Sequence, residues 1–492
     1  MLIIAFIQSV IVVALIVSGR RRLENALPVF CFFLTLMPLE AKLVIPGLFD
    51  LNIMRVSLLT LLGLFFYKRN NSLREKLPLI KLMYMHVAWA LCSTVYSLSF
   101  ATSIKQLLAQ LIEFYLMYYL IFRIITSMET IHKMLNAMTM AIGICCLFSL
   151  CEVYASWSIL RIFPASNWIT YNGGLDPLYS ELGRGLRVRS TFPHPILFGD
   201  ALAISIILSL YLLGYWAEGK RRLFLWVSLM LMFWAIYKTQ SRGPWLATII
   251  CSFLMFLMVK KKIRRYLITA FVIALVVLLA RPGVWQSIDA LYQASTDPNQ
   301  PVGTSYLYRH ALADSIVSAV QKEPGRLLLG YGLGTFRELG LEVNFLGERR
   351  RWYTCDNNWA SFLYETGYVG LILIGILLFW PLVLAFRNYW KLPKPESTLS
   401  GVLFISIAGF YFLMLSVAAY SWGQQGYMNW ILISMSISLP GIARRRRRAI
   451  GENRRQKGSG RGKYFDYDPY LTHGPEGLID DRLTQTHSLT NH

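Results

Sequence analysis

The sequence predicts an all-α fold, a polytopic membrane helix bundle of 12 or 13 transmembrane helices with a partly helical extracytoplasmic cap. Of the 492 residues, 55% are hydrophobic and 15% are charged, whereas soluble domains average roughly 45–50% apolar and about 25% charged residues. The apolar residues gather in runs of about 17–25, the length that spans a bilayer as a helix. Basic clusters flank these runs, as is typical of polytopic membrane proteins.

Thirteen apolar runs are candidate membrane helices. They fall near residues 2–18, 27–45, 53–67, 78–98, 104–124, 133–154, 195–215, 222–239, 243–259, 265–281, 360–386, 399–420 and 428–443. The pattern is least regular over residues 27–67, because Pro28, Pro38 and Pro46 interrupt it. A count of twelve helices therefore stays open.

The net charge of +22 raises the question of a nucleic-acid partner, and its distribution argues against one. The basic clusters each stand beside the end of an apolar run: Arg20–Arg22, Lys68–Arg69, Lys220–Arg222, Lys260–Arg265 and Arg444–Arg448. Lys and Arg collect in the short cytoplasmic loops of membrane proteins. We therefore expect an inner-membrane protein that binds membrane lipid and no nucleic acid, with its N-terminus outside and its C-terminus cytoplasmic.

This topology divides the chain into a membrane domain over residues 1–448 and a disordered cytoplasmic tail over residues 449–492. Two long loops, residues 155–194 and 282–359, fall outside. The second contains an amphipathic stretch from Ser305 to Gln321, with Tyr306, Ala311, Ile316 and Val320 at helical spacing. The two loops are expected to form a cap over the bundle. The first run begins at Leu2 without a basic region or cleavage site, which predicts a retained helix.

The first candidate site is a group of arginines before the run at 195–215. Arg184, Arg187 and Arg189 lie in the first external loop, where positive charge opposes the topological bias. Guanidinium groups bind phosphate through two parallel hydrogen bonds, so an anionic, lipid-borne substrate would balance this charge. Ordinary loop charge is the alternative interpretation.

The second candidate is Ser241-Arg242-Gly243, which separates two apolar runs with almost no loop. An arginine at that depth is costly unless it is paired or faces an aqueous cavity, which makes it a functional candidate. The alternative is a side chain that reaches outward to the lipid headgroups.

The third candidate is Arg309-His310 in the second external loop, followed by Pro324 and the glycines Gly330, Gly332 and Gly334. Glycine-rich loops can hold phosphate with backbone N–H groups, but this one lacks the Lys and Ser/Thr of a P-loop. We interpret the glycines as turn-forming residues. His310 and His194 are the external histidines within reach of a substrate.

The fourth candidate is Asp356-Asn357-Asn358-Trp359, followed by Glu365-Thr366-Gly367. Asp356 and Glu365 are separated by about two and a half helical turns, so one helix would place them on opposite sides. This spacing predicts separate roles, with one carboxylate as a general base and the other anchoring an arginine. Two structural salt bridges are the alternative.

Several ionisable residues fall inside or beside apolar runs and keep a transporter hypothesis open, because membrane carboxylates can relay protons. They are Glu40, Lys42, His86, Glu113, Glu152 and Asp200. Their positions are scattered, and they define no discontinuous-helix site of the kind that transporters use.

The four candidate clusters, in this order, resemble the O-antigen ligase and O-antigen polymerase superfamily of bacterial membrane glycan polymerases and ligases. The resemblance covers residues 180–385. Its first motif reads Arg187-Val188-Arg189-Ser190-Thr191-Phe192 with Pro195, and its Ser-Arg-Gly motif reads Ser241-Arg242-Gly243 with Trp245. The large loop carries Arg309, Pro324 and the segment Gly330 to Phe336, and it ends in Asp356-Asn357 with Glu365 and Gly367.

The resemblance implies metal-independent glycosyl transfer without a cofactor, from a polyprenyl-diphosphate-linked glycan to a sugar hydroxyl of a second lipid-linked glycan. It implies Asp356, Arg242 and Arg309 as catalytic residues, with Asp356 as base or acceptor-orienting group. Arg187, Arg189, Glu365, His310 and Asn357 are the implied substrate-binding residues. A chain-length regulator and a flippase are the partners that such an enzyme would have.

This sequence departs from the family pattern at three positions. Asp356 stands where the ligases have His, which favours the polymerase side of the family; Ser190 replaces a Gly, and Ile196 replaces the usual Asn. The leading hypothesis is a polymerase of lipid-linked polysaccharide repeats for O-antigen, capsule or exopolysaccharide. The alternatives are a ligase that moves glycan to a lipid or protein acceptor, a lipid-glycan transporter, and a scaffold subunit without catalysis.

Overall fold

The computed structural model is an all-α bundle with three small two-stranded sheets. It describes residues 2–39, 41–43, 50–68, 76–163, 178–181, 185–215, 219–259, 261–280, 283, 286, 289, 292–293, 301–345 and 347–458. The sequence-predicted fold class is confirmed, because each of the thirteen apolar runs coincides with a helical segment.

The N-terminal half of the bundle contains nine helical segments in the described residues. They are α1 (Leu2–Gly19), η1 (Leu23–Asn25), α2 (Ala26–Leu36), α3 (Ile53–Tyr67), α4 (Ile80–Val95), α5 (Phe100–Gln110), the π-helical turn η3 (Leu111–Leu116), α6 (Met117–Ile124) and α7 (Met128–Tyr154). A short hairpin, β1 (Lys42–Leu43) and β2 (Leu51–Asn52), joins α2 to α3.

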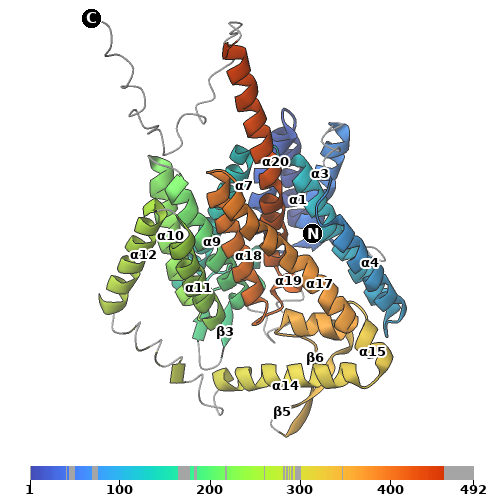
Figure 1. The fold of residues 1–492 in the computed structure, drawn as a ribbon. Coiled ribbons are helices and arrows are strands. Elements are labelled where there is room, and N and C mark those ends of the chain that lie inside the picture. Colours follow the sequence, from blue (N-terminus) through green and yellow to red (C-terminus); the bar gives the residue numbers. More distant parts are fainter. Residues whose placement is uncertain are drawn as a thin grey trace, which may run out of the picture.

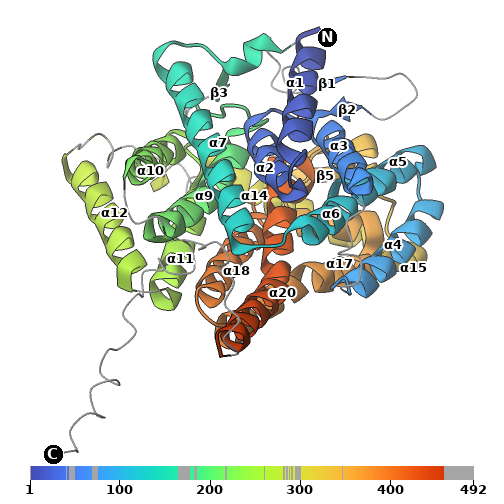
Figure 2. The ribbon, with the colours of Figure 1, turned by 90° about the horizontal axis from the view of Figure 1, so that it is seen from above.

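The C-terminal half of the bundle surrounds α9 (Pro195–Tyr215), which is apolar on every side and almost wholly buried. The other helices are α10 (Lys220–Lys238), α11 (Arg242–Met258), α12 (Lys261–Ala280), α17 (Asn358–Lys391), α18 (Glu396–Leu413), α19 (Ala419–Trp422) and α20 (Gln424–Gly458). Helices α7, α10, α11 and α18 pack around α9 (Figure 2). An all-round apolar helix requires such a covered position.

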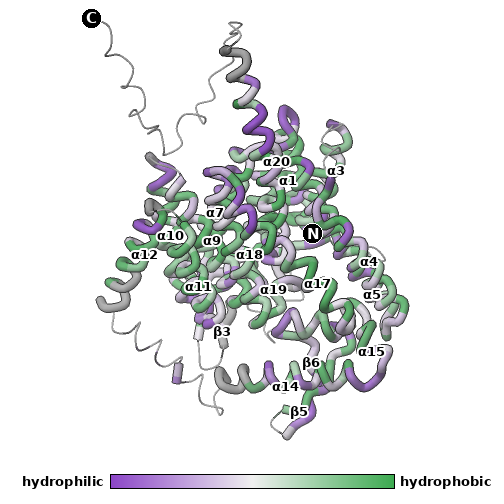
Figure 3. The backbone as a smooth tube through the Cα atoms, viewed as in Figure 1, coloured by the Kyte–Doolittle hydropathy of each residue, from purple (hydrophilic) through white to green (hydrophobic). Residues whose placement is uncertain are grey.

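Among the described residues, six helical segments are long and apolar enough to cross a membrane, namely α1, residues 100–124, α7, α9, α17 and α18, and four shorter segments are also apolar. The hydropathy of the chain follows the same pattern, with hydrophobic residues along the helices and hydrophilic residues gathered toward the two ends of the bundle (Figure 3). The protein is therefore a multi-pass membrane protein.

The residues of the second predicted external loop form a small, partly helical cap, as predicted. It consists of α14 (Pro301–Gln321), α15 (Pro324–Leu329), α16 (Thr335–Leu339) and the hairpin β5 (Leu341–Phe345) and β6 (Glu348–Trp352). Tyr308, Leu312, Ile316 and Val320 form the buried stripe of α14, so Ile316 and Val320 were predicted correctly, whereas Ala311 is only partly buried. The side chain of Tyr306 lies outside the described residues.

The cap and the arginine-rich end of α20 lie at opposite ends of the bundle (Figure 1). The first external loop contributes η4 (Ile159–Ile162) and the hairpin β3 (Tyr179–Glu181) and β4 (Gly185–Arg187) at the cap end. The expectation that Arg444–Arg448 face the cytoplasm and the cap faces outward stays a prediction from the charge distribution.

Three predicted boundaries are corrected by the structure. The span at 27–45 is helical only to Leu36, because the residue before Pro38 is driven into the extended conformation that Met37 adopts. The span at 399–420 breaks after Leu413 and resumes as α19. The first residues of the predicted tail, 449–458, continue α20, since Arg, Ala, Glu, Lys and Gln are good helix formers. The rest of the predicted tail lies outside the described residues.

Candidate functional site

An ion pair between the cap and the bundle forms the centre of the candidate site. Arg309 on α14 places its Nη2 atom 3.6 Å from Oδ2 of Asp356, which lies just before α17, and both side chains are partly exposed. This separation is longer than a hydrogen bond. The carboxylate of Asp356 therefore keeps acceptor capacity for another hydroxyl or N–H group.

The surroundings of Asp356 favour its protonated form. Burial raises the pKa of its carboxyl above the ordinary aspartate value, and the positive charge of Arg309 opposes this shift. Neighbouring contacts fix the segment: Tyr308 donates its hydroxyl to Thr354 O at 3.0 Å, and the Tyr308 and Trp352 rings lie 4.2 Å apart. A positioned carboxyl with a raised pKa is a typical arrangement for a general base.

Arg242 brings a second cation to this pair. It is the first residue of α11, follows the extended N-cap Ser241 and is exposed. Its positive charge and that of Arg309 repel each other. Arg309 thus has the Asp356 carboxylate on one side and is close enough to Arg242 for the two guanidinium charges to interact, and an anion between the two guanidinium groups would relieve their repulsion.

The break between α18 and α19 holds the two sides of this site together. Asn358, the first residue of α17, donates its N–H to Met414 O at 2.9 Å and accepts the N–H of Tyr420 at 2.8 Å. A Cβ on Gly243 would stand 3.0 Å from Ser416 Oγ. The starts of α11 and α17 are therefore anchored to the same segment, which sets the position of Arg242 relative to Asp356.

Arg187 lies beside the Arg242 motif, although it is buried. Its Nε donates to Thr239 O at 2.9 Å and its Nη2 donates to Ser241 Oγ at 2.9 Å, and the side chain is only 2% exposed. The structure thus gives Arg187 a role in fixing the turn that precedes Arg242. The diphosphate contact expected of Arg187 remains a prediction.

Glu152 on α7 anchors the first motif, and the sequence had suggested it only as a transporter residue. Its Oε2 accepts the backbone N–H groups of Arg189 and Ser190 at 3.0 and 3.1 Å, and its Oε1 accepts the hydroxyl of Ser158. Ser190 adopts φ +54°, a conformation that glycine adopts without strain, and it occupies the position where the family has Gly. Arg189 itself is 1% exposed and donates to Pro193 O.

The glycines Gly330, Gly332 and Gly334 of the cap have positive φ, in keeping with the turn-forming role that the sequence predicted, and they also pack closely against neighbouring residues. Gly330 donates its N–H to Arg326 O, Tyr331 to Tyr364 O and Gly332 to Glu365 O. The N–H of Gly334 bonds the Glu365 carboxylate. Because these N–H groups already have protein acceptors, they are not oriented to hold a phosphate.

Substitution of Gly332 by alanine tests this packing role. It has φ +106°, and a Cβ there would stand 2.0 Å from Ser97 Oγ and 2.4 Å from Ser97 Cβ. We expect Gly332→Ala to destabilise the protein by about 2–4 kcal/mol through overpacking and backbone strain, measured as a lower thermal midpoint in detergent. Gly347→Ala is the control, because Gly347 also has positive φ but has nothing within 4 Å of a Cβ. Equal losses for both variants would contradict the packing argument.

The other predicted site residues divide into two groups. Asn357 is the N-cap of α17, with Oδ1 accepting the N–H groups of Trp359 and Ala360, and Glu365 supports the glycine segment. These contacts give both residues structural roles. His310 is exposed beside Arg309 on α14, whereas His194 Nδ1 accepts the N–H of Ile196. Arg184 lies outside the described residues.

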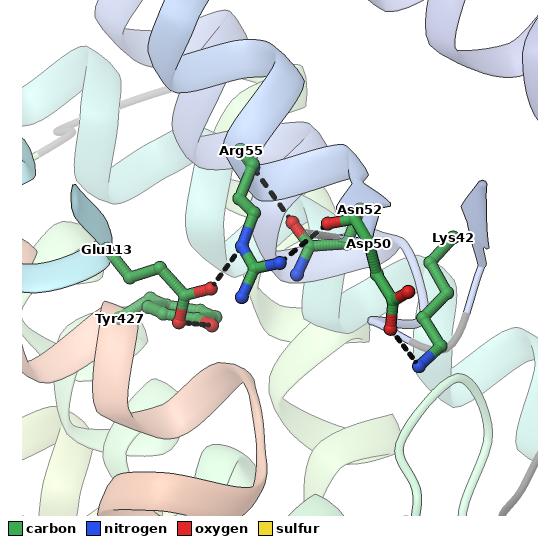
Figure 4. Close-up of polar contacts among 6 residues, drawn as sticks. All are labelled: Lys42, Asp50, Asn52, Arg55, Glu113 and Tyr427. Atoms are coloured by element: carbon green, nitrogen blue, oxygen red, sulfur yellow. Dashed lines mark hydrogen bonds and ion pairs between the residues drawn. The ribbon is translucent and has the colours of Figure 1, made fainter. Parts of the chain in front are cut away.

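Most residues behind the transporter hypothesis have protein partners. Glu113 accepts from Arg55 Nε at 2.7 Å and from the Tyr427 hydroxyl at 2.6 Å, and Lys42 pairs with Asp50 (Figure 4). His86 Nδ1 lies 2.7 Å from the Tyr115 hydroxyl. Asp200 is fully buried, and Glu40 lies outside the described residues. These contacts bind helices to one another.

Comparison with known proteins agrees with the geometry. Residues 227–375 match the family model of the O-antigen ligase domain, and no curated protein matches the chain. The matched segment runs from α10 to α17 and includes Arg242, Arg309, Asp356 and Glu365. This segment is therefore similar to the O-antigen ligase family, and the match supports the O-antigen ligase superfamily as the relatives of this chain.

Proposed function

We propose that this protein polymerises lipid-linked polysaccharide repeat units at the outer face of the inner membrane. The donor is a glycan on polyprenyl diphosphate, and the acceptor is a sugar hydroxyl of a second lipid-linked glycan. The observation that carries the proposal is the ion pair between Arg309 and the Asp356 carboxylate, with Arg242 close enough to Arg309 for their positive charges to repel. The family match supports the glycan-processing class of activity.

The chemistry needs a base for the acceptor hydroxyl and a cationic group for the diphosphate, which leaves from the far side of the reacting carbon. Because Arg309 lies 3.6 Å from Asp356 in the free protein, Arg309 has to move away from the carboxylate to reach that diphosphate. The acceptor oxygen forms a bond to the anomeric carbon while the bond from that carbon to the diphosphate oxygen breaks. The hydroxyl proton passes to Asp356, and the electron pair leaves with the polyprenyl diphosphate. In this proposal Arg242 and Arg309 stabilise the charge that develops on this leaving group, and alignment of the two substrates supplies a further part of the rate.

A reconstituted reaction tests the proposal. Purified full-length protein, given only lipid-linked repeat units in detergent or vesicles, is expected to lengthen the glycan and release polyprenyl diphosphate. The reaction should need neither ATP nor added metal and should persist in the presence of a chelator. An active flippase and a chain-length regulator are the expected cellular partners, and the regulator would alter product length without being required for bond formation.

The carrier of the product distinguishes the two activities of the family. A polymerase leaves the longer glycan on polyprenyl diphosphate, whereas a ligase moves it to a lipid or protein acceptor. Asp356 in place of the ligases' His favours the first outcome. Elongation that appears only when a different carrier is added would establish the ligase instead, and movement of intact donor across the bilayer without bond formation would establish a transporter.

The pH dependence of the reaction is expected to follow the carboxyl of Asp356. As a base it must be ionised, so activity rises as the pH rises through its pKa, which burial has raised. Arg309 lowers that pKa. Arg309→Gln should therefore move the acidic half-activity point to higher pH, in addition to lowering the maximum rate.

The measurement is the normalised rate of elongation against pH, with Arg309→Lys as the charge-preserving control. Arg309→Lys keeps a cation near the carboxylate and is expected to retain the wild-type midpoint. An unchanged midpoint in Arg309→Gln would show that another group, and not Asp356, controls the acidic limb.

A further inference from the structure

A cavity of about 750 Å³ opens at the end of the bundle opposite the cap. It lies between the residues that precede α4, the last turn of α6, the C-terminal part of α17 and the basic part of α20. Figure 2 looks onto this end of the molecule, where α20 packs beside α17 and α18. None of the residues assigned to the candidate functional site lines it.

Positive charge dominates the lining of this cavity. Seven cationic residues contribute to it: Lys76, Arg387, Lys391, Arg444, Arg445, Arg447 and Arg448. Among the described residues that line it, none is acidic. Cations collected around one hollow repel each other, and an anion between them removes that repulsion.

The spacing of these cations along α17 and α20 places several of them on the same helix face, next to the cavity. Arg387 and Lys391 are four residues apart on α17, so they share one helix face. Arg444, Arg447 and Arg448 share a face of α20 in the same way. Arg446 between them points elsewhere and bonds the buried carboxylate of Glu396 at 3.2 Å. Pairing with Glu396 uses one arginine of the run and leaves the others at the cavity.

The cavity also has an apolar wall. Phe122, Leu384, Leu392, Ile437 and Pro440 line it together with the cations. An apolar wall below a cationic rim, at the end of membrane helices, fits an amphiphile with a negatively charged head. A free anion would leave the apolar wall uncovered.

We propose that this cavity is a binding site for an anionic phospholipid of the cytoplasmic leaflet. The phosphodiester headgroup sits among Arg387, Lys391 and Arg447, and the upper part of an acyl chain covers Leu384 and Ile437. Basic pockets between transmembrane helices bind phosphate-bearing lipids in this manner. The bound lipid joins α17 to α20, and the proposal does not depend on the catalytic function of the cap side.

Two triple variants with the same change in charge test the proposal. Arg387→Gln/Lys391→Gln/Arg447→Gln removes three cations from the cavity. Arg20→Gln/Arg21→Gln/Arg22→Gln removes three exposed cations that do not line it. Both sets of substituted residues lie at the same end of the bundle. Arg445, next to the cavity residues of α20, bonds Thr126 O, and the Thr126 hydroxyl bonds the carboxylate of Glu24, two residues after Arg22.

The experiment measures lipid binding to delipidated full-length protein in neutral detergent, by native mass spectrometry and by the thermal midpoint. Phosphatidylglycerol and cardiolipin are the probes, and phosphatidylethanolamine is the zwitterionic control. We expect saturable binding of the anionic lipids to the wild type and to the Arg20–Arg22 variant. Binding to the cavity variant should be at least about tenfold weaker.

Three outcomes would overturn the proposal. Equal weakening in both triple variants would show a general attraction of the basic surface for anionic lipid. Unchanged binding in the cavity variant would show that the lipid sits elsewhere. Displacement of bound lipid by inorganic phosphate at equal concentration would assign the cavity to a soluble anion. The lipid-binding measurement tests only the cavity, and the glycan-elongation measurement tests only the cap-side site. Failure of one proposal can therefore be distinguished from failure of the other.

Discussion

Arg242→Ala is expected to lower the maximum rate of glycan elongation by about 10²–10³-fold, the effect of removing one preorganised group that stabilises developing charge. Arg242 begins α11 at an exposed position, and its charge opposes that of Arg309. This repulsion is unfavourable in the free protein, and a bound diphosphate would offset it. The thermal midpoint is measured beside the rate, so that a loss of activity can be distinguished from a loss of folded protein.

Arg337→Ala is the matched control for Arg242→Ala. Arg337 lies on α16 in the cap and is exposed, so its removal changes the charge of the same side of the molecule by the same amount. We expect Arg337→Ala to retain nearly full elongation. If Arg242→Ala also retained full elongation while the thermal midpoint stayed normal, the diphosphate-binding role of Arg242 would be wrong.

Much of the fold was predictable because the membrane imposes it. A long apolar run inside lipid must be helical, and each of the thirteen runs proved to coincide with a helix. The predicted ends of two helices were wrong, because the apolar run continues past the point where the helix stops. Helix α2 ends at Leu36, just before Pro38, and α18 ends at Leu413. At the other end, Arg444–Arg448 extended α20 beyond the predicted boundary.

The site was partly predictable because its cations oppose the expected distribution of charge. Arg187 and Arg189 stood out for that reason, and Arg242 stood out because it lies between two apolar runs. The structure places Arg309 beside Asp356, with Arg242 near Arg309. Asn357 was predicted to bind substrate, and its capping role was missed, although Asn before an apolar helical run is a common N-cap. The anchor formed by Glu152 was not, because its contacts with Arg189 and Ser190 join residues far apart in the sequence.

Arg187 shows why residue type alone does not assign a role. A guanidinium group in an external loop suits a phosphate, yet the structure gives this one two oxygen acceptors from the turn before Arg242. The cavity at the opposite end shows that a residue with an ordinary explanation in the sequence can also line a candidate binding site. Arg444–Arg448 followed the topological rule, and only the packing of α17 against α20 reveals that part of this run surrounds a hollow.

We expect Asp356→Asn to lower kcat by about 10²–10⁴-fold, because a positioned general base contributes a factor of this size to the rate. Asparagine preserves the size of the side chain and cannot take a proton from the acceptor hydroxyl. The substitution also removes the negative charge 3.6 Å from Arg309, which leaves that cation freer to bind the diphosphate. The KM for the donor should therefore stay the same or fall while kcat drops.

This split between kcat and KM distinguishes a base from a group that only orients the acceptor. An orienting carboxylate would act on binding, so its loss would raise the KM for the acceptor and change kcat little. Asp314→Asn supplies the control, because Asp314 is an exposed carboxylate on the same helix as Arg309 and should leave both constants near the wild-type values. A raised acceptor KM with a preserved kcat in Asp356→Asn would contradict proton transfer to Asp356, and the rate enhancement would then have to arise from Arg242, Arg309 and substrate alignment.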